Sequence, residues 1–352
     1  IGSLILGHAT TGTLNNALGN TAVGYAALDA ITSGDYNTAL GSTVLSSNTS
    51  GGQNTGIGYH ALSANTTGDF NTAIGVQALY ANTTGTRNLA IGKDALDAAD
   101  EENDNLAIGY AALGGAIAGG EYNVAIGNYS LDANTSGDYN VAVGYDGLTA
   151  NTSGASNTAM GYGALKANTT GYYNIAIGTG AYDGADSEHN NLAIGYDALG
   201  GAIDDGTYNV AIGNYSLDAN TTGDYGTGVG YNALTSNTTG QRNTVIGAGA
   251  LATNTTGNYN TASGYEALTS NTTGNGNTAS GYEALKDANR TADTDGYNTA
   301  LGYLAGNTGT NDVTTGNKNT LLGASSAASA AAGTNQTVIG YGATGQANNS
   351  VT

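Results

Sequence analysis

Apolar positions recur along the chain with a period of seventeen, so that equivalent units begin at Asn20, Asn37 and Asn54. Each period has a core that reads Asn-x-Ala-Ile-Gly, then x-Ala-Leu, then a polar stretch close to Asn-Thr-Thr-Gly-x-Tyr. Within the Asn-x-Ala-Ile-Gly motif, the second and fourth positions lie on one face of an extended chain and the third and fifth on the other, because side chains alternate along a β-strand. β-branched residues and Leu occupy the second and fourth positions, as at Leu89 and Ile91. We therefore predict a short strand with these two positions facing the core, and a second short strand that points Leu62 and its equivalents inward.

The period continues without a gap, so the sequence predicts one repeat array over residues 1–352 rather than several globular domains. The step between units is seventeen, except for eighteen after Asn105 and Asn191, and twenty-one after Asn277 and Asn298. A block of five units that begins at Asn105 is duplicated from Asn191. Such a duplication is tolerated only in a fold that grows by adding equivalent units. The predicted coils begin at residues 3, 20, 37, 54, 71, 88, 105, 123, 140, 157, 174, 191, 209, 226, 243, 260, 277, 298, 319 and 336.

The fold class follows from the length of one unit. Such a unit is too short for a pair of helices, and Gly, Asn and Thr are weak helix formers. Asn, Asp and Gly in the polar stretch are typical turn residues. We predict an all-β protein, a parallel β-solenoid (β-roll) of about twenty 17-residue coils, each about 4.8 Å from the next.

Two columns of the repeat have a regular composition that calls for a structural explanation. Asn at the first position is expected to form a stacked amide ladder, the alternative being a hydrogen-bonding array for a glycan. Ala and Gly at the third and fifth positions mark a face that another backbone approaches closely. Because the core of one coil is small, we expect copies of the chain to associate through this Ala/Gly face. The ladder positions are Asn20, Asn37, Asn71, Asn88, Asn105, Gly24, Gly75 and Gly109.

Composition and charge remove several classes of function. The chain has 27 acidic and 7 basic residues, a net charge of −20, which argues against nucleic acid as a partner. No run of residues is long and apolar enough for a membrane span, so no membrane insertion is expected in this segment. Cys is absent and the three His residues are isolated, so we expect no catalytic residues, no cofactor and no enzyme activity.

Acidic turns are the candidates for an ion site, because oxygen-rich loops can hold Ca²⁺. The alternative for these turns is a solvated acidic surface. The Ca²⁺ candidates are Asp97, Asp100, Glu101, Asp183, Asp186 and Glu188. The two longest units carry insertions, and insertions are where solenoids place binding functions. The candidate receptor-facing loop residues are Asp287, Asn289, Arg290, Asn307, Asn311 and Asp312.

Three further columns have both a structural and a functional interpretation. Thr-rich turns, such as Thr66 and Thr67, suggest either stacked polar ribbons or an ice-binding surface. Asn-x-Ser/Thr in the same turns suggests either turn chemistry or glycosylation. Tyr residues follow the Gly or precede the Asn, as at Tyr145 and Tyr139, and either pack at a corner of the coil or stack on sugars.

The motifs N-T-A-I-G, N-V-A-I-G and N-L-A-I-G resemble the N-S-V-A-I-G signature of the YadA-like head repeat of trimeric autotransporter adhesins. The longer consensus, N-T-A-I-G-Y-x-A-L-x-x-N-T-T-G, is similar to repeats of phage tail-fibre proteins. The resemblance implies a homotrimer, intertwined or side by side, in an extracellular fibre of a virion or a cell surface. Such a fibre is a structural spacer that attaches to a surface, a glycan or a host receptor. The alternatives are a bacterial cell-surface adhesin head and an ice- or Ca²⁺-binding solenoid.

Overall fold

The computed structural model describes residues 4–6, 17–115, 119–201, 203–288 and 296–352. The chain divides into two compact units, Ile1–Tyr173 (unit 1) and Asn174–Thr352 (unit 2). Within the described residues each unit is an all-β parallel β-solenoid of short strands and turns, without a helix. This confirms the predicted fold class and the 17-residue coil.

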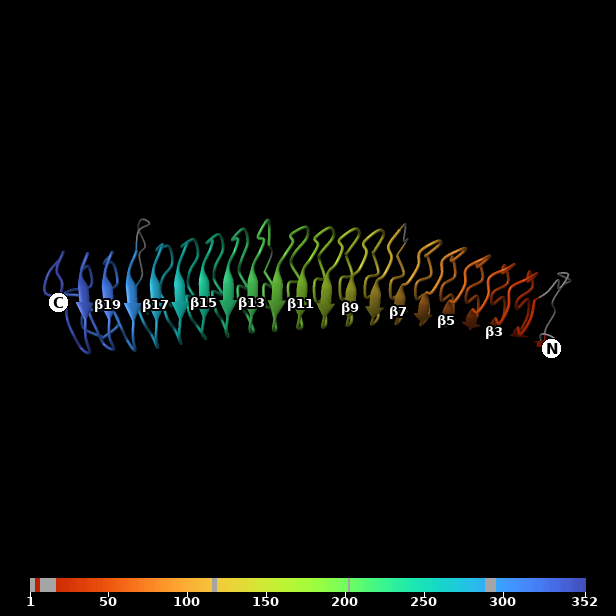
Figure 1. Cartoon of the computed structure of the whole chain (residues 1–352), viewed down its shortest axis with the longest axis horizontal. Helices are drawn as coiled ribbons and strands as arrows, with labels where there is room; N and C mark the ends of the chain where they lie inside the picture. Colours follow the sequence, from red (N-terminus) through yellow and green to blue (C-terminus); the bar gives the residue numbers. More distant parts are fainter. Residues whose placement is uncertain (1–3, 7–16, 116–118, 202, 289–295) are drawn as a thin grey trace. The chain divides into compact units, whose positions relative to one another are not determined.

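The strands of unit 1 are three residues long and lie side by side in sequence order, each parallel to the next (Figure 1). They are β1 (Leu4–Leu6), β2 (Thr21–Val23), β3 (Thr38–Leu40), β4 (Thr55–Ile57), β5 (Thr72–Ile74), β6 (Leu89–Ile91), β7 (Leu106–Ile108), β8 (Val124–Ile126), β9 (Val141–Val143) and β10 (Thr158–Met160).

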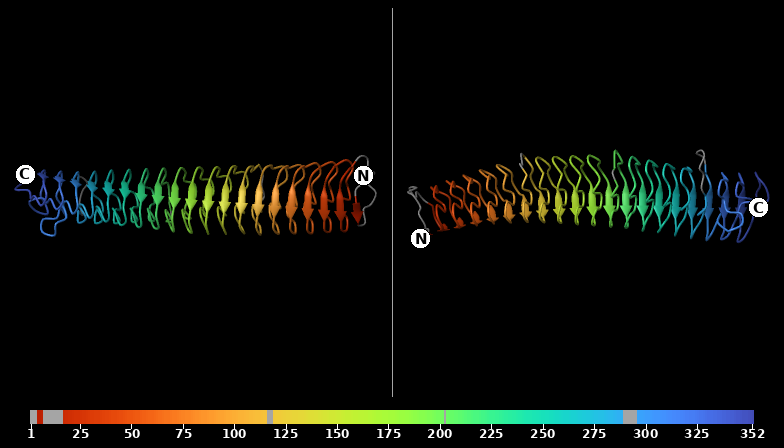
Figure 2. Two further views of the ribbon diagram at one scale, coloured as in Figure 1. Left: turned by 60° about the horizontal axis from the view of Figure 1, so that its bottom comes forward. Right: turned by 180° about the vertical axis from the view of Figure 1, so that it is seen from behind.

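Unit 2 repeats the arrangement, with its strands as a row of parallel arrows and the turns beside them (Figure 2). Its strands are β11 (Ile175–Ile177), β12 (Leu192–Ile194), β13 (Val210–Ile212), β14 (Thr227–Val229), β15 (Thr244–Ile246), β16 (Thr261–Ser263), β17 (Thr278–Ser280), β18 (Thr299–Leu301), β19 (Thr320–Leu322) and β20 (Thr337–Ile339).

The strands pair in a register that keeps each repeat position in one column. Ala90 of β6 lies opposite Ala107 of β7, and Ala107 lies opposite Ala125 of β8 although this second step is one residue longer. In unit 2, Thr278 of β17 lies opposite Thr299 of β18 across one of the two longest steps. The longer steps therefore leave the columns of the sheet unchanged.

The side chains that face the interior are not the ones we predicted from the alternation. The central residue of each strand from β2 to β20 is buried, as Ala90 is in β6, whereas Leu89 and Ile91 on either side of it are partly exposed. The interior is filled by this Ala together with Ala95 and Leu96 of the same coil. The prediction that the second and fourth positions face the core is wrong. In most coils the interior is filled by Leu from the turn, and the strand contributes only the methyl group of Ala.

The Gly column is a contact within the chain rather than the predicted contact between chains. Gly92 has a φ of +139°, a conformation that side-chain-bearing residues rarely adopt. A Cβ on Gly92 would lie 2.2 Å from the carbonyl oxygen of Gly109 in the next coil. Gly24 and Gly75 have the same conformation and the same close neighbour one coil on. Gly is thus required by the packing of one coil on the next, and the expected Ala/Gly association face is wrong.

The second predicted strand is a turn in the structure. Leu62 does point into the core, but it has a φ of +52°, in the left-handed region. Its N–H donates to the carbonyl oxygen of Ala78 in the next coil at 3.0 Å. A left-handed L-residue costs about 1–2 kcal/mol, whereas burying a Leu side chain contributes about 1.5–3 kcal/mol. The strained turn therefore persists because it places Leu in the interior.

Candidate functional site

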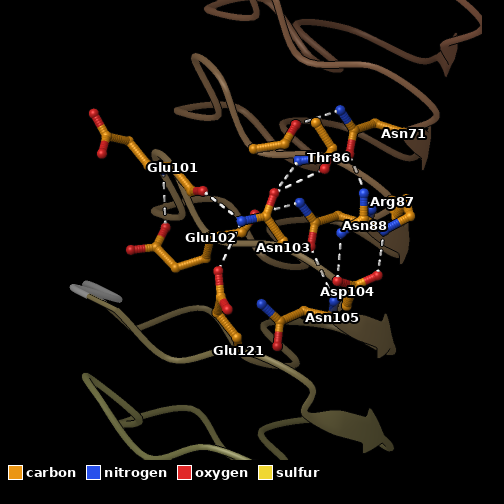
Figure 3. A network of polar contacts seen from close by, with 11 residues as sticks. Asn71, Thr86, Arg87, Asn88, Glu101, Glu102, Asn103, Asp104, Asn105 and Glu121 are labelled. Atoms are coloured by element: carbon orange, nitrogen blue, oxygen red, sulfur yellow. Dashed lines mark hydrogen bonds and ion pairs between the residues drawn. The ribbon is translucent and has the colours of Figure 1, made fainter.

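The Asn ladder of the first position lies inside the coils. The backbone N–H of Asn105 donates to Oδ1 of Asn88 at 3.0 Å, and that of Asn88 donates to Oδ1 of Asn71 at 2.9 Å (Figure 3). The Nδ2 of Asn37 donates to the carbonyl oxygen of Gly51, which joins the start of the coil to its end, and Oδ1 of Asn20 accepts from the N–H of Asn37. These amides are buried. A ligand cannot reach them, so the ladder is structural.

A second amide column runs through the Asn-Thr-Thr-Gly turns. Asn65 is buried, and its Nδ2 donates to Oδ1 of Asn48 at 3.0 Å and to the carbonyl oxygen of Gly68 at 3.1 Å. The Asn residues of these Asn-x-Ser/Thr sequences are all buried, so a folded coil has no room for a glycan on them. They are Asn48, Asn65, Asn82, Asn134, Asn151, Asn168, Asn220, Asn237, Asn254 and Asn271.

One coil of unit 1 replaces this turn by acidic residues (Figure 3). The buried carboxylate of Glu102 accepts the N–H groups of Asp100 and Glu101 at 2.8 and 3.1 Å. Asn103 donates to Glu121 in the next coil at 2.7 Å. The carboxylates are thus used to cap backbone and amide donors of the turn.

At the edge of the same coil, Asp104 pairs with Arg87 of the preceding coil, with Nε at 2.6 Å from Oδ1 (Figure 3). The hydrogen bond from this guanidinium lowers the pKa of the Asp104 carboxyl. The pair lies at the surface, where an ion pair contributes little to stability.

The six Ca²⁺ candidates do not converge in either unit. Asp97 is half-buried, and burial and then the charge of Asp94 raise the pKa of its carboxyl. Asp100 accepts a hydrogen bond from Thr83, and Glu101 points away from the turn (Figure 3). Glu188 accepts the N–H of Asp186 at 2.9 Å. Among the described residues, no three His, Cys, Asp or Glu side chains are grouped in a way that could hold a metal ion.

Unit 2 contains one polar hollow near these residues, of about 230 Å³. It is lined by Ser187, Glu188, Asp204 and Asp205. Asp183, the remaining candidate, is half-buried and is not among the lining residues. The hollow is therefore acidic, with the Glu188 carboxylate already bound to the backbone of its own turn.

The insertion loops are only partly described, because Asn289 and Arg290 lie outside the described residues. Asp287 and Asn311 are half-buried, and Asn307 is buried. Oδ1 of Asp312 accepts the N–H groups of Thr308 and Gly309, and so closes its own loop. Asn307 and Asp312 therefore have a structural role within the insertion.

The Thr turns and the Tyr columns differ in what they leave exposed. The hydroxyl of Thr66 donates to the carbonyl oxygen of Thr83 in the next coil at 3.0 Å, so this donor is used within the chain, while Thr67 is exposed. The Tyr residues are exposed and lie on one another. The rings of Tyr145 and Tyr162 are stacked with centroids 5.7 Å apart, and those of Tyr122 and Tyr139 with centroids 5.0 Å apart.

The outward face of the strands was not expected from the sequence. The second and fourth positions of the repeat, which are the first and last residues of each strand, form two columns on this face, and none of the described strands contains a charged residue. Large apolar side chains are open to solvent there, with Leu40 48% and Met160 43% exposed in unit 1 and Ile246 51% exposed in unit 2. The signal that could have found this face is the third position, which is Ala or Gly in most units, since small residues fit inside a narrow coil.

No protein-family model matches the chain, and no curated protein matches it. Within the part of the chain that the structure describes, no helix is long and apolar enough to cross a membrane.

Proposed function

We propose that the chain is a structural segment of an extracellular attachment fibre, on a virion or a cell surface, in which three copies lie along one another. The observation that carries the proposal is the uncharged, largely apolar face formed by the first and last residues of the strands, which are the second and fourth positions of the repeat. An exposed apolar surface of this extent is typical of an interaction site. Copies of a chain with a net charge of −20 repel one another, and a face without charged residues is where that repulsion opposes contact least.

The partner that fits this face best is another copy of the chain. Its columns repeat at the strand spacing, about 4.8 Å, and a second copy presents columns with the same spacing. Association would bury the Ile, Leu and Val side chains that each solenoid leaves exposed, at about 25 cal/mol for each Å². The number of copies, three, follows from the resemblance to trimeric fibre repeats.

The mass of the chain in solution tests the proposal. We expect a mass near three times 34.6 kDa by light scattering. The triple variant Leu40→Glu, Ile74→Glu and Met160→Glu places charges on the strand face and should lower the mass to that of one chain. The control variant Ser50→Glu, Thr67→Glu and Ser153→Glu adds the same charge on exposed turns and should keep the wild-type mass. A wild-type monomer, or equal dissociation of both variants, would contradict the proposal.

A second function is supported by one observation in unit 2. From β15 to β18, the first residue of the strand, which is the second position of the repeat, is an exposed Thr in four successive strands, as at Thr244 and Thr261. Regular rows of hydroxyl and methyl groups on a flat sheet are suited to an ordered water lattice. An ice-binding solenoid would show thermal hysteresis as a monomer, and Thr261→Lys should abolish it. A trimer without thermal hysteresis would exclude this alternative.

A further inference from the structure

An unbroken column of planar side chains runs along one edge of unit 2. It consists of Tyr208, Tyr225, Arg242 and Tyr259, which precede the first-position residues of four successive coils, and we call it the Tyr–Arg column. The rings of Tyr208 and Tyr225 are stacked with centroids 5.1 Å apart and planes 5° apart. The guanidinium of Arg242 lies 5.5 Å from the ring centroids of both Tyr225 and Tyr259, and its Nη1 donates to the Tyr259 hydroxyl at 3.0 Å.

Core packing does not explain this column. Its Tyr side chains are 47–59% exposed, and all four residues have a φ between 55° and 59°, in the left-handed region. Gly276 occupies the same repeat position in the next coil with a φ of 66°. A left-handed position is more easily filled by Gly, so the large planar side chains are retained at a conformational cost.

Polar side chains accompany the column, one residue earlier in each coil. Oδ1 of Asp224 accepts the N–H of Thr207 at 2.8 Å, and Oδ1 of Asn258 accepts the N–H of Gln241 at 2.7 Å. These bonds orient the carboxylate of Asp224 and the side-chain amide of Asn258 beside the rings. The edge therefore presents phenol hydroxyls, a guanidinium, amides and a carboxylate next to apolar ring edges.

We infer that the Tyr–Arg column binds an extended neutral polysaccharide that lies along it, with about one sugar ring for each coil. The inference rests on the proposed attachment function and names the ligand class of such a surface. A β-linked hexopyranose chain repeats its rings at nearly the strand spacing of about 4.8 Å, so column and ligand stay in step. Its hydroxyls match the polar row and the phenol hydroxyls, and its apolar C–H groups can contact the exposed part of the rings.

Charge selects a neutral ligand over an anionic one. The chain has a net charge of −20 and Arg242 is the only cation in the column, so a polyanion would be repelled.

The duplicated block places the shorter pair Tyr122 and Tyr139 at the corresponding positions of unit 1, with rings 5.0 Å apart and without an Arg. Each unit would thus offer one binding edge.

Titration calorimetry with cellohexaose and chitohexaose as probes tests the inference. We expect at least one of them to bind, and the double variant Tyr225→Ala and Tyr259→Ala to weaken the tightest binding roughly tenfold. Arg242→Lys, which keeps the charge and loses the planar group, should also weaken binding. The control Tyr231→Ala removes an equally exposed ring from another column of unit 2 and should leave binding unchanged.

Three results would overturn the inference: no binding of either probe, an equal loss in Tyr231→Ala, or tighter binding of a heparin hexasaccharide. The exposed positions of the variants predict unchanged circular dichroism and melting, so a loss of binding cannot be attributed to unfolding. Light scattering of the same samples separates this test from the proposed function. A trimer that binds neither probe contradicts polysaccharide binding by the Tyr–Arg column but not the proposed fibre. A monomer contradicts the proposed fibre, and the calorimetry then decides on polysaccharide binding independently.

Discussion

A Cβ atom on Gly85 would lie 2.3 Å from Oδ1 of Asn82, three residues earlier in the same turn. The equivalent positions of the next coil hold Ala99 and Glu102, so the turn has two forms, Asn with Gly or Ala with Glu. In the second form the Glu102 carboxylate caps the N–H groups of Asp100 and Glu101. Oδ1 of Asn82, which faces this coil, is buried and has no hydrogen-bond partner.

These two forms predict a strongly coupled double-mutant cycle. Ala99→Asn alone should destabilise the turn by about 1–3 kcal/mol, because its Oδ1 meets the Cβ of Glu102. Glu102→Gly alone removes the acceptor of three N–H groups, those of Asp100, Glu101 and Gly119, and should also destabilise. The double variant recreates the Asn–Gly turn, satisfies Asn82, and should be about 1 kcal/mol more stable than the wild type. Amide hydrogen exchange of this coil measures the cycle, and additive effects would contradict it.

The Gly column predicts different outcomes for two Gly→Ala substitutions in unit 1. Gly92→Ala should cost about 3 kcal/mol or more, because the Cβ meets the Gly109 carbonyl and the φ of +139° is strained. At Gly147 the nearest atom to an added Cβ is 3.7 Å away, and Ala is the usual residue at this position. Gly147→Ala should stabilise by about 0.4–1 kcal/mol. Denaturant midpoints compare the two, and similar midpoints would refute the argument.

The left-handed turn positions predict opposite effects at two neighbouring residues. Gln77 and Leu79 have φ values of 59° and 51°, but only Leu79 is buried. Gly163 and Gly180 occupy the position of Gln77 in other coils, so Gln77→Gly should stabilise by up to about 1 kcal/mol. Leu79→Gly relieves the same strain but removes a core side chain, and should destabilise by about 2–5 kcal/mol. Thermal melting distinguishes them by the sign of the shift.

The half-buried Asp132 predicts a pH dependence of stability. Burial, and then the charge of Asp146, raises the pKa of the Asp132 carboxyl. The folded chain therefore binds this proton more tightly than the unfolded chain, and stability falls as the pH rises through the folded pKa. Asp132→Asn should raise the melting temperature at pH 7 and leave it unchanged below pH ~3.5, under the ordinary carboxyl pKa of about 3.9.

Asp104 provides a comparison of opposite sign. The hydrogen bond from Arg87 lowers the pKa of its carboxyl, so its contribution is present at neutral pH and is lost as the pH falls through the folded pKa. Asp104→Asn should therefore lower the melting temperature slightly at pH 7. If both variants shift the melting temperature in the same direction at pH 7, the burial argument for Asp132 fails.

Much of the fold was predictable, but part of the candidate site was not. The regular period and the Asn column predict stacked coils with an amide ladder, and Asn71, Asn88 and Asn105 form that ladder. The sequence shows that the turns at Asp100 and Glu188 are acidic. It does not show that a carboxylate of each turn accepts the backbone N–H groups of that turn, because this depends on where the N–H groups point. The Tyr–Arg column was visible only as recurrent Tyr, because stacking depends on the register of successive coils.

The sequence by itself determined the period, the all-β class and the columns, because each coil must repeat the same hydrogen bonds with its neighbours. It did not determine which face of the strand is inside. Both faces carry acceptable strand residues, mostly Ala on one and Thr, Leu, Val or Ile on the other, and alternation is symmetric between them. Only the tertiary structure decided, because a coil that closes around Leu96 has space for the methyl group of Ala90 and none for Ile91. The larger side chains therefore form the outer face, where we place the contact between copies.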